Sequence, residues 1–157
     1  MGESVYTGWM YRGRRPPDDA AYLANMARCV FQSGMSWAIV ASKWPAFVEA
    51  FEGFDVAKVA GYGAGDIARL KGDSHIVRNR RKILATIHNA REMERIEGEH
   101  GSVAAWLDSL DRSNNYAGVI RRVLQTFKHL GSTSAPLWLY SVGEPIDVDA
   151  LVKSRFG

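Results

Sequence analysis

Three groups of basic residues are the part of this sequence best suited to binding a charged partner. They are Arg12, Arg14 and Arg15; Arg78, Arg80, Arg81 and Lys82; and Arg121 and Arg122. Cations spaced this closely can neutralise the phosphates of a nucleic acid. Each group can equally form the solvated face of a helix, so both interpretations stay open. The net charge of +3 adds only weak support for a nucleic-acid partner, since many unrelated proteins share it.

Residue types that bind metals are sparse and scattered. Cys29 is the single cysteine, so neither an intramolecular disulfide nor a zinc site of paired cysteines can form. His75, His88, His100 and His129 lie on separate elements and make no H-x-x-x-H pair. We therefore predict no metal and no cofactor. A lone cysteine also favours a reducing, cytoplasmic compartment.

The composition is that of a folded protein of one domain, residues 1–157. Hydrophobic residues make up 46% of the chain and charged residues 24%, which excludes a disordered polymer. No apolar run approaches the roughly 18 residues that a membrane span needs. The N-terminus also lacks the charge, apolar stretch and cleavage site of a signal peptide. We expect no membrane association.

Apolar residues recur every three to four positions along most of the chain, which predicts an all-α fold. Helices are expected over about 17–32, 37–52, 55–60, a short segment ending near 71, 77–97, 102–110, 116–127 and 132–142. Residues 1–15 show no period and are expected to form an irregular arm. The residues expected to cap helices are Ser36, Asp55 and Ser102, and those expected to face the core from the long helix are Ile83, Leu84, Ile87 and Met93.

Three segments resemble the bacterial 3-methyladenine DNA glycosylase family, in order and in spacing. Residues 31–37, Phe-Gln-Ser-Gly-Met-Ser-Trp, resemble its Q-x-G-(L/F)-x-W turn. Residues 54–60 resemble its F-D-P-x-x-V-A element, and residues 76–83, with Asn89 and Ala90, resemble its I-(I/V)-R-N-x-x-K-I…N-A helix start. The resemblance covers about residues 17–107. It implies a helix-hairpin-helix orthogonal bundle that binds double-stranded DNA containing alkylated bases.

The resemblance also implies a DNA-binding hairpin. Two helices between Val119 and Val142 flank residues 128–131, Lys-His-Leu-Gly, where the superfamily directs backbone N–H groups at a phosphate. An ordinary turn between helices is the alternative. The residues expected to contact DNA are Lys128, His129, Gly131 and Ser132 of the hairpin, Arg78 of the family motif, and Met35, an apolar wedge.

Asp149 is the expected catalytic residue. It stands where the superfamily carries an aspartate after a Gly/Pro-rich loop, and Leu151, Val152 and Arg155 then match the positions that follow that aspartate. Asp147 is the alternative. Both carboxylates can instead be helix caps. The base-binding candidates are Trp37, Gln32 and Cys29. Trp37 matches a base-stacking tryptophan of the family, although a core position is the other interpretation.

The sequence departs from the family in three places. It lacks the terminal Cys and His residues that hold zinc in some members, and Cys29 stands where they carry a base-reading Glu. It also stops at Gly157, which suggests C-terminal truncation. No lysine matches the superfamily's Schiff-base position. The sequence therefore predicts a monomeric, monofunctional glycosylase that removes alkylated purines in base-excision repair; a non-catalytic DNA-binding helix-hairpin-helix module is the alternative.

Overall fold

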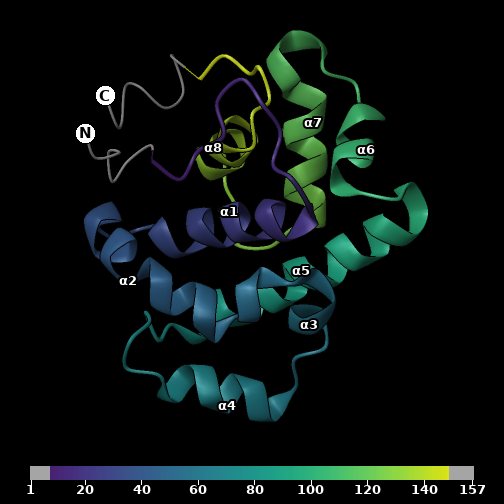
Figure 1. Cartoon of the computed structure of the whole chain (residues 1–157). Helices are drawn as coiled ribbons and strands as arrows, with labels where there is room; N and C mark the ends of the chain where they lie inside the picture. Colours follow the sequence, from purple (N-terminus) through teal and green to yellow (C-terminus); the bar gives the residue numbers. More distant parts are fainter. Residues whose placement is uncertain (1–7, 149–157) are drawn as a thin grey trace.

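The computed structural model describes residues 8–148, which form a bundle of helices joined by short loops (Figure 1). The helices are α1 (Asp19–Gln32), α2 (Trp37–Ala50), α3 (Val56–Ala60), α4 (Ala64–Gly72), α5 (Arg80–His100), α6 (Val103–Asp108), α7 (Ser113–Thr126) and α8 (Ser134–Ser141), with a 3-10 turn, η1 (Glu52–Phe54). No strand occurs among these residues. The predicted all-α class is confirmed.

Most of the helices begin where a side chain can replace the missing backbone acceptor. Ser36, Asp55 and Ser102 cap α2, α3 and α6 as the sequence predicts. Asp18 and Asn79 do the same for α1 and α5. Each accepts a hydrogen bond from the N–H three residues onward, which fixes the start of the helix. The short loops between elements follow from these defined starts.

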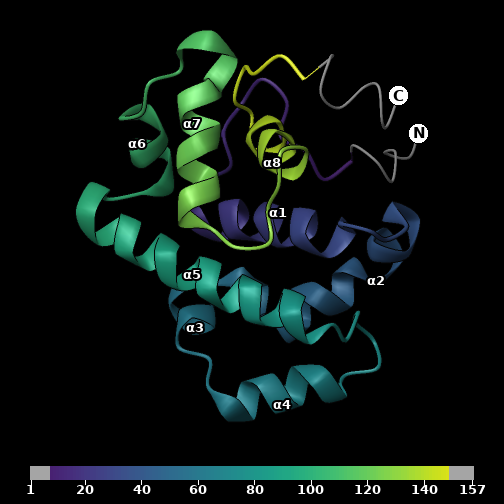
Figure 2. The ribbon, with the colours of Figure 1, turned by 180° about the vertical axis from the view of Figure 1, so that it is seen from behind.

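Helix α1 runs through the middle of the molecule, between α5 on one side and α7 and α8 on the other (Figures 1 and 2). Leu23, Met26 and Phe31 of α1 are fully buried there. Trp138 of α8 is also fully buried, and its indole N–H donates to the Tyr22 carbonyl at 3.1 Å. The first turn of α1 is therefore bonded to α8, and its last turn is packed into the core through Phe31.

The long helix differs from its sequence prediction in three details. It begins at Arg80 rather than near 77, because Asn79 caps it. It continues past Gly98 to His100 and ends at Gly101. Leu84 is 36% exposed instead of facing the core, since it lies at the border of the buried stripe formed by Ile83 and Ile87. Val48 of α2 is also exposed.

The described part of the N-terminal arm, residues 8–16, is irregular as predicted but is packed against the end of α8. The Tyr11 N–H donates to the Ser141 carbonyl at 2.9 Å. Gly143 has φ +84°, and a Cβ there would overlap the Arg14 carbonyl oxygen. Only glycine permits this approach. Among residues 8–148 no helix combines the length and apolar character needed to cross a bilayer.

Candidate functional site

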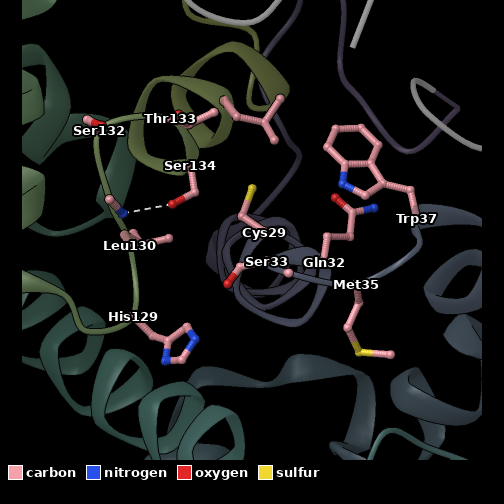
Figure 3. Close-up of a pocket in the computed structure, with 13 residues that line it drawn as sticks. Cys29, Gln32, Ser33, Met35, Trp37, His129, Leu130, Ser132, Thr133 and Ser134 are labelled. Carbon is pink, nitrogen blue, oxygen red and sulfur yellow. Dashed lines mark hydrogen bonds between the residues drawn. The ribbon is translucent and has the colours of Figure 1, made fainter. Parts of the chain in front are cut away.

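A pocket of about 980 Å³ opens between the end of α1 and the start of α8 (Figure 3). Seven of the predicted site residues line it: Cys29, Gln32, Met35, Trp37, His129, Gly131 and Ser132. They come from four places, namely the last turn of α1, the α1–α2 turn, the first turn of α2 and the α7–α8 hairpin. The fold therefore brings together residues up to about a hundred positions apart in the sequence.

Trp37 and Met35 reach the pocket because the chain turns sharply after α1. Gly34 adopts φ +71°, a left-handed conformation that costs glycine little. Ser36 then caps α2, so Trp37 occupies the first position of the new helix. The Trp37 ring is 8% exposed and meets Trp9 edge-on, with 6.3 Å between ring centroids. Met35 is half-buried at the rim.

Lys82 ties this turn to α5, a role that the sequence did not reveal. Its Nζ donates to the carbonyls of Phe31, at 3.0 Å, and Ser33, at 2.6 Å. The side chain is buried, and burial lowers the pKa of its ammonium. Lys82 therefore satisfies carbonyls at the end of α1 and is not available to a phosphate. Of the two interpretations left open for its basic group, neither a phosphate contact nor a solvated helix face describes Lys82 in the fold.

Asn89 of α5 holds the hairpin in place through two hydrogen bonds to Lys128. The Asn89 amide accepts from the Lys128 N–H at 2.8 Å and donates to the Lys128 carbonyl at 3.1 Å. The next residue, His129, has φ +62°, a strained conformation for a residue with a Cβ. Burial, Lys82 and Arg81 lower the pKa of the His129 imidazole, which favours its neutral form. Asn89 belongs to the matched family motif, but its role emerges only from the fold.

The hairpin offers backbone donors to an anion, although not all of those expected. The Gly131 N–H donates to Ser134 Oγ at 2.8 Å and is therefore occupied. The N–H groups of Leu130 and Ser132, which also line the pocket, have no acceptor within residues 8–148. Arg78 and Lys128 are exposed and lie outside the pocket lining. The structure therefore does not bring these two predicted DNA contacts together with the pocket residues.

The model of the methyladenine glycosylase family matches residues 9–139 of this chain. The chain belongs to this family. It is 41% identical over 66 residues to DNA-3-methyladenine glycosylase 1 of Escherichia coli (strain K12), which is 42% of this chain and 35% of that protein. It is 36% identical over 77 residues to DNA-3-methyladenine glycosylase of Haemophilus influenzae, or 48% of this chain and 42% of that protein. The matched segments thus span less than half of these relatives.

Solved structures of 3-methyladenine DNA glycosylase I share the fold across nearly the whole chain. One, in complex with 3-methyladenine, superposes with a TM-score of 0.75 at 26% identity, covering 92% of this chain and 88% of the other. A structure of the Staphylococcus aureus protein gives the same TM-score and identity and covers 92% and 87%. These likenesses agree with the family membership.

Within the family fold, the described residues of the pocket bring no carboxylate to it. Among the described residues that line it there is no Asp or Glu. Cys29 is buried, and burial raises the pKa of its thiol far above its usual range, so it stays neutral. Gln32 is 3% exposed, and neither atom of its amide has a hydrogen-bond partner in the part of the chain that the structure describes. The polar groups facing a ligand from α1 are therefore an uncharged thiol and an uncharged amide.

Of the two candidate catalytic aspartates, Asp147 and Asp149, the structure describes only Asp147. Asp147 does not line the pocket, and its backbone N–H and carbonyl are both bonded to the Asn115 amide, each at 2.8 Å. The structure thus gives no support to the Asp147 register. Asp149, the preferred candidate, lies outside the described residues. Within residues 8–148 no group of three His, Cys, Asp or Glu side chains is placed to hold a metal ion.

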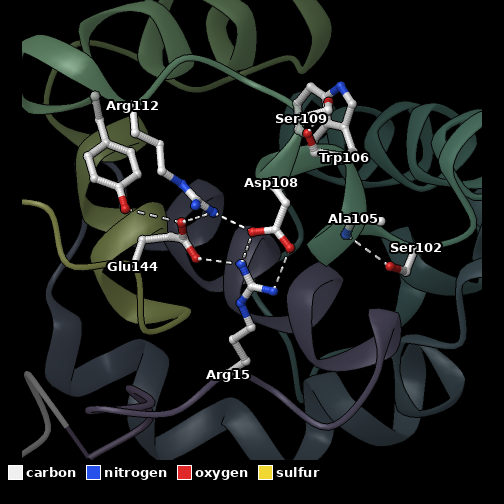
Figure 4. Close-up of polar contacts among 9 residues, drawn as sticks. Arg15, Ser102, Ala105, Trp106, Asp108, Ser109, Arg112 and Glu144 are labelled. Carbon is white, nitrogen blue, oxygen red and sulfur yellow. Dashed lines mark hydrogen bonds and ion pairs between the residues drawn. The ribbon is translucent and has the colours of Figure 1, made fainter.

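A second polar cluster lies at the far end of the molecule, around buried Glu144 (Figure 4). Glu144 accepts from Tyr116 Oη at 3.2 Å and pairs with Arg112 at 3.0 Å and Arg15 at 3.6 Å. Both arginines also bond to Asp108. Arg15 is therefore engaged in an ion-pair network, a role that neither open interpretation of its basic group includes. Nothing in the sequence pattern marks this cluster, because its members come from separate elements.

Proposed function

We propose that this chain is a monofunctional DNA glycosylase that flips an alkylated purine out of double-stranded DNA and hydrolyses its N-glycosidic bond. The observation that carries this is the pocket, in which Trp37 and the unpartnered Gln32 amide face the donors of the hairpin. A family relative of the same fold has been solved with 3-methyladenine. One copy of the chain supplies both pocket and hairpin, so we expect a monomer to act.

Binding begins at the phosphates. The free N–H groups of Leu130 and Ser132, before the N-terminus of α8, suit a phosphate oxygen. Exposed Arg78 and Lys128 add charge on the same side as the hairpin and the α5 start. Because this binding releases counterions from DNA, its affinity should fall steeply as salt rises. These contacts hold the duplex but read no base.

Flipping exposes the base to the pocket. Extrusion costs a few kcal/mol, and less for a damaged pair, so lesions enter more readily. Met35, half-buried on the α1–α2 turn at the pocket rim, would fill the gap left in the stack. The flipped base would stack on the Trp37 face. An alkylated purine is cationic, and an aromatic face attracts a cation by about 0.5–2 kcal/mol.

Cleavage passes through an oxocarbenium-like sugar. In this proposal Asp149 stabilises that charge and orients the water. A cationic base is already a good leaving group, so a pocket with little acid catalysis is sufficient. Among the described residues no lysine lines the pocket, and Lys82 is bonded to two carbonyls. We therefore expect hydrolysis without strand cleavage.

The test is base release from methylated duplex DNA, comparing wild type with Asp149→Asn and Asp147→Asn. We expect release by the wild type, about 100-fold slower release by Asp149→Asn, and little change with Asp147→Asn. The reverse order of the two variants would move the catalytic role to Asp147. Salt-dependent DNA binding without any release would instead identify a non-catalytic DNA-binding module. Cys29, which stands where the family carries a Glu, would then agree with that function.

A further inference from the structure

A buried arginine near the end of α1 links three separate segments of the chain. Arg28 is 5% exposed, and its guanidinium lies 5.3 Å from the centroid of the Trp9 ring and 5.0 Å from that of Trp44. Trp9 belongs to the N-terminal arm and Trp44 to α2. Burial lowers the pKa of the guanidinium to about 10, so it is still a cation at neutral pH. One charged side chain of α1 therefore lies between an aromatic ring of the arm and one of α2.

The two rings differ in how firmly the rest of the chain holds them. Trp44 is stacked on Phe54, with 5.4 Å between ring centroids and 12° between planes, and it contacts Phe47 at 5.3 Å. Both phenylalanines are fully buried. Trp9 is half-buried in an irregular segment, and its indole N–H has no acceptor among residues 8–148. Trp44 is thus fixed by the core, whereas the orientation of the Trp9 ring depends on packing against Arg28.

An arginine is well suited to hold a ring in this place. Its planar guanidinium stacks on aromatic faces, and a cation attracts an aromatic ring more strongly when both are shielded from water. Asn25, one turn earlier on the same face of α1, holds the Trp9 backbone separately by donating to its carbonyl at 3.4 Å. Because backbone and ring have different supports, loss of the Arg28 cation should release the ring without detaching the arm.

Trp9 connects this contact to the pocket. Its ring meets Trp37 edge-on, with 6.3 Å between ring centroids and 70° between planes. Trp37 lines the pocket (Figure 3) and is the ring on which the flipped base is proposed to stack. An edge-to-face pair is a favourable arrangement only while the two planes stay near perpendicular. A Trp9 ring free to turn would no longer brace Trp37, and the Trp37 indole would then present its face to the base less often.

We propose that Arg28 is a positioning residue of the base pocket: it holds the Trp9 ring against Trp37 and so fixes the surface on which the base stacks. The inference rests on the proposed glycosylase activity and adds to it a residue that does not line the pocket. Arg28 acts on the base only through Trp9. Since the stack exists before and during cleavage, its loss weakens binding of the base and leaves the rate of the bound complex nearly unchanged.

A double-mutant cycle tests this dependence on Trp9. Calorimetric titration with free 3-methyladenine gives a dissociation constant, and base release from methylated duplex DNA gives KM and kcat. Arg28→Met, which has a similar length but no cation, should raise Kd and KM about tenfold and change kcat less than about twofold. Trp9→Leu should have the same effect. Adding Arg28→Met to Trp9→Leu should then raise Kd and KM no further.

Two further variants serve as controls. Arg69 of α4 also lies over an aromatic ring, that of Tyr62 at 5.4 Å, but outside the pocket lining, so Arg69→Met should leave Kd and KM as they are. Arg28→Lys keeps the cation but loses the planar group, so it should raise Kd only about threefold. If Arg28→Met does not fold, the cycle is measured with Arg28→Lys, and that smaller effect should likewise vanish in the Trp9→Leu background.

The results separate this inference from the proposed function. Additive effects of the two substitutions would overturn it, because Arg28 would then act by a route other than Trp9. An unchanged Kd in the folded Arg28 variant, or a fall in kcat alone, would overturn it as well. In each of these cases the wild type still binds and releases the base, so the glycosylase proposal stands. A wild type that neither binds nor releases 3-methyladenine contradicts the proposed function, and the role of Arg28 falls with it.

Discussion

Glu144 and Gln32 are about equally buried, yet their polar atoms are in opposite situations. Glu144, beside the start of α7, meets Tyr116, Arg112 and Arg15. Gln32, at the end of α1, meets no hydrogen-bond partner among residues 8–148. Its neighbours Arg28 and Trp9 likewise each bury an N–H without an acceptor. The pocket end therefore holds most of the buried polar atoms that the described chain leaves unbonded.

This difference in hydrogen bonding distinguishes polar groups that stabilise the fold from polar groups that can bind a ligand. A buried polar atom is stabilising only when bonded, so natural chains retain unbonded ones mainly where function requires them. Around Glu144 even the strained backbone has a structural use: Asn115 and Tyr116, both with positive φ, direct their side chains to Asp147 and Glu144. We therefore expect mutations at the two ends to have opposite effects on stability.

The largest effect is expected at Glu144. Glu144→Gln removes the charge that balances Arg15 and Arg112, which are 40% and 37% exposed. Since solvent screens the arginines in part, the loss should be roughly 2 kcal/mol, below the value for a fully buried pair. Tm should fall by roughly 4–8 °C. Thermal melting followed by circular dichroism measures it, with exposed Glu49→Gln as the matched control. Equal melting of the two variants would mean that the cluster contributes no net stability.

At the other end, Gln32→Met should stabilise the chain. Methionine has a similar length and carries no amide that needs a partner, so about 1 kcal/mol should be gained and Tm should rise by about 2–4 °C. Base release should fall in the same variant. Exposed Gln125→Met should change neither property. A fall in Tm on replacing Gln32 would show that its amide is bonded in solution, which would remove the contrast with Glu144.

Much of the fold could be predicted from the sequence because its signals are local. Caps at Ser36, Asp55 and Ser102 and the apolar period of α1 and α5 depend only on neighbouring residues. The start of α7 could not be predicted, because its left-handed residues are stabilised by contacts with Asp147 and Glu144, some thirty positions later. Leu84 was misplaced because periodicity alone does not locate the edge of a buried stripe.

The pocket could be predicted only through the family motif. Spacing placed Gln32, Met35 and Trp37 on one turn, and the structure brings the hairpin to them. Lys82 and Asn89, which hold the turn and the hairpin, lie in the same motif, but their roles depend on packing between distant helices. The available signal was that Lys82 and Asn89 both fall in the matched motif, which could have suggested positioning roles for them.

The smallest expected change in stability concerns Glu97, whose carboxyl is less well bonded than that of Glu144 but, unlike the Gln32 amide, has a hydrogen-bond partner. Glu97 of α5 is partly buried and has Asp19 as its hydrogen-bond partner, with Glu94 and Asp55 nearby, and these raise the pKa of its carboxyl to about 7. Because the folded chain holds the proton more tightly than the unfolded one, the stabilisation is complete below about pH 4.5 and is lost as pH rises to about 7. The side chain is partly solvated, so the change should stay below about 1 kcal/mol.

Glu97→Gln should remove this pH dependence. The difference in unfolding free energy between the variant and the wild type should grow in favour of the variant from pH 5 to pH 8, measured by urea denaturation at each pH. Glu49→Gln should show no such trend, because its carboxyl is exposed. A constant difference across this range would mean that Asp19 and Glu97 do not share a proton near neutrality, and that Glu97, like Glu144, has its charge balanced in the folded chain.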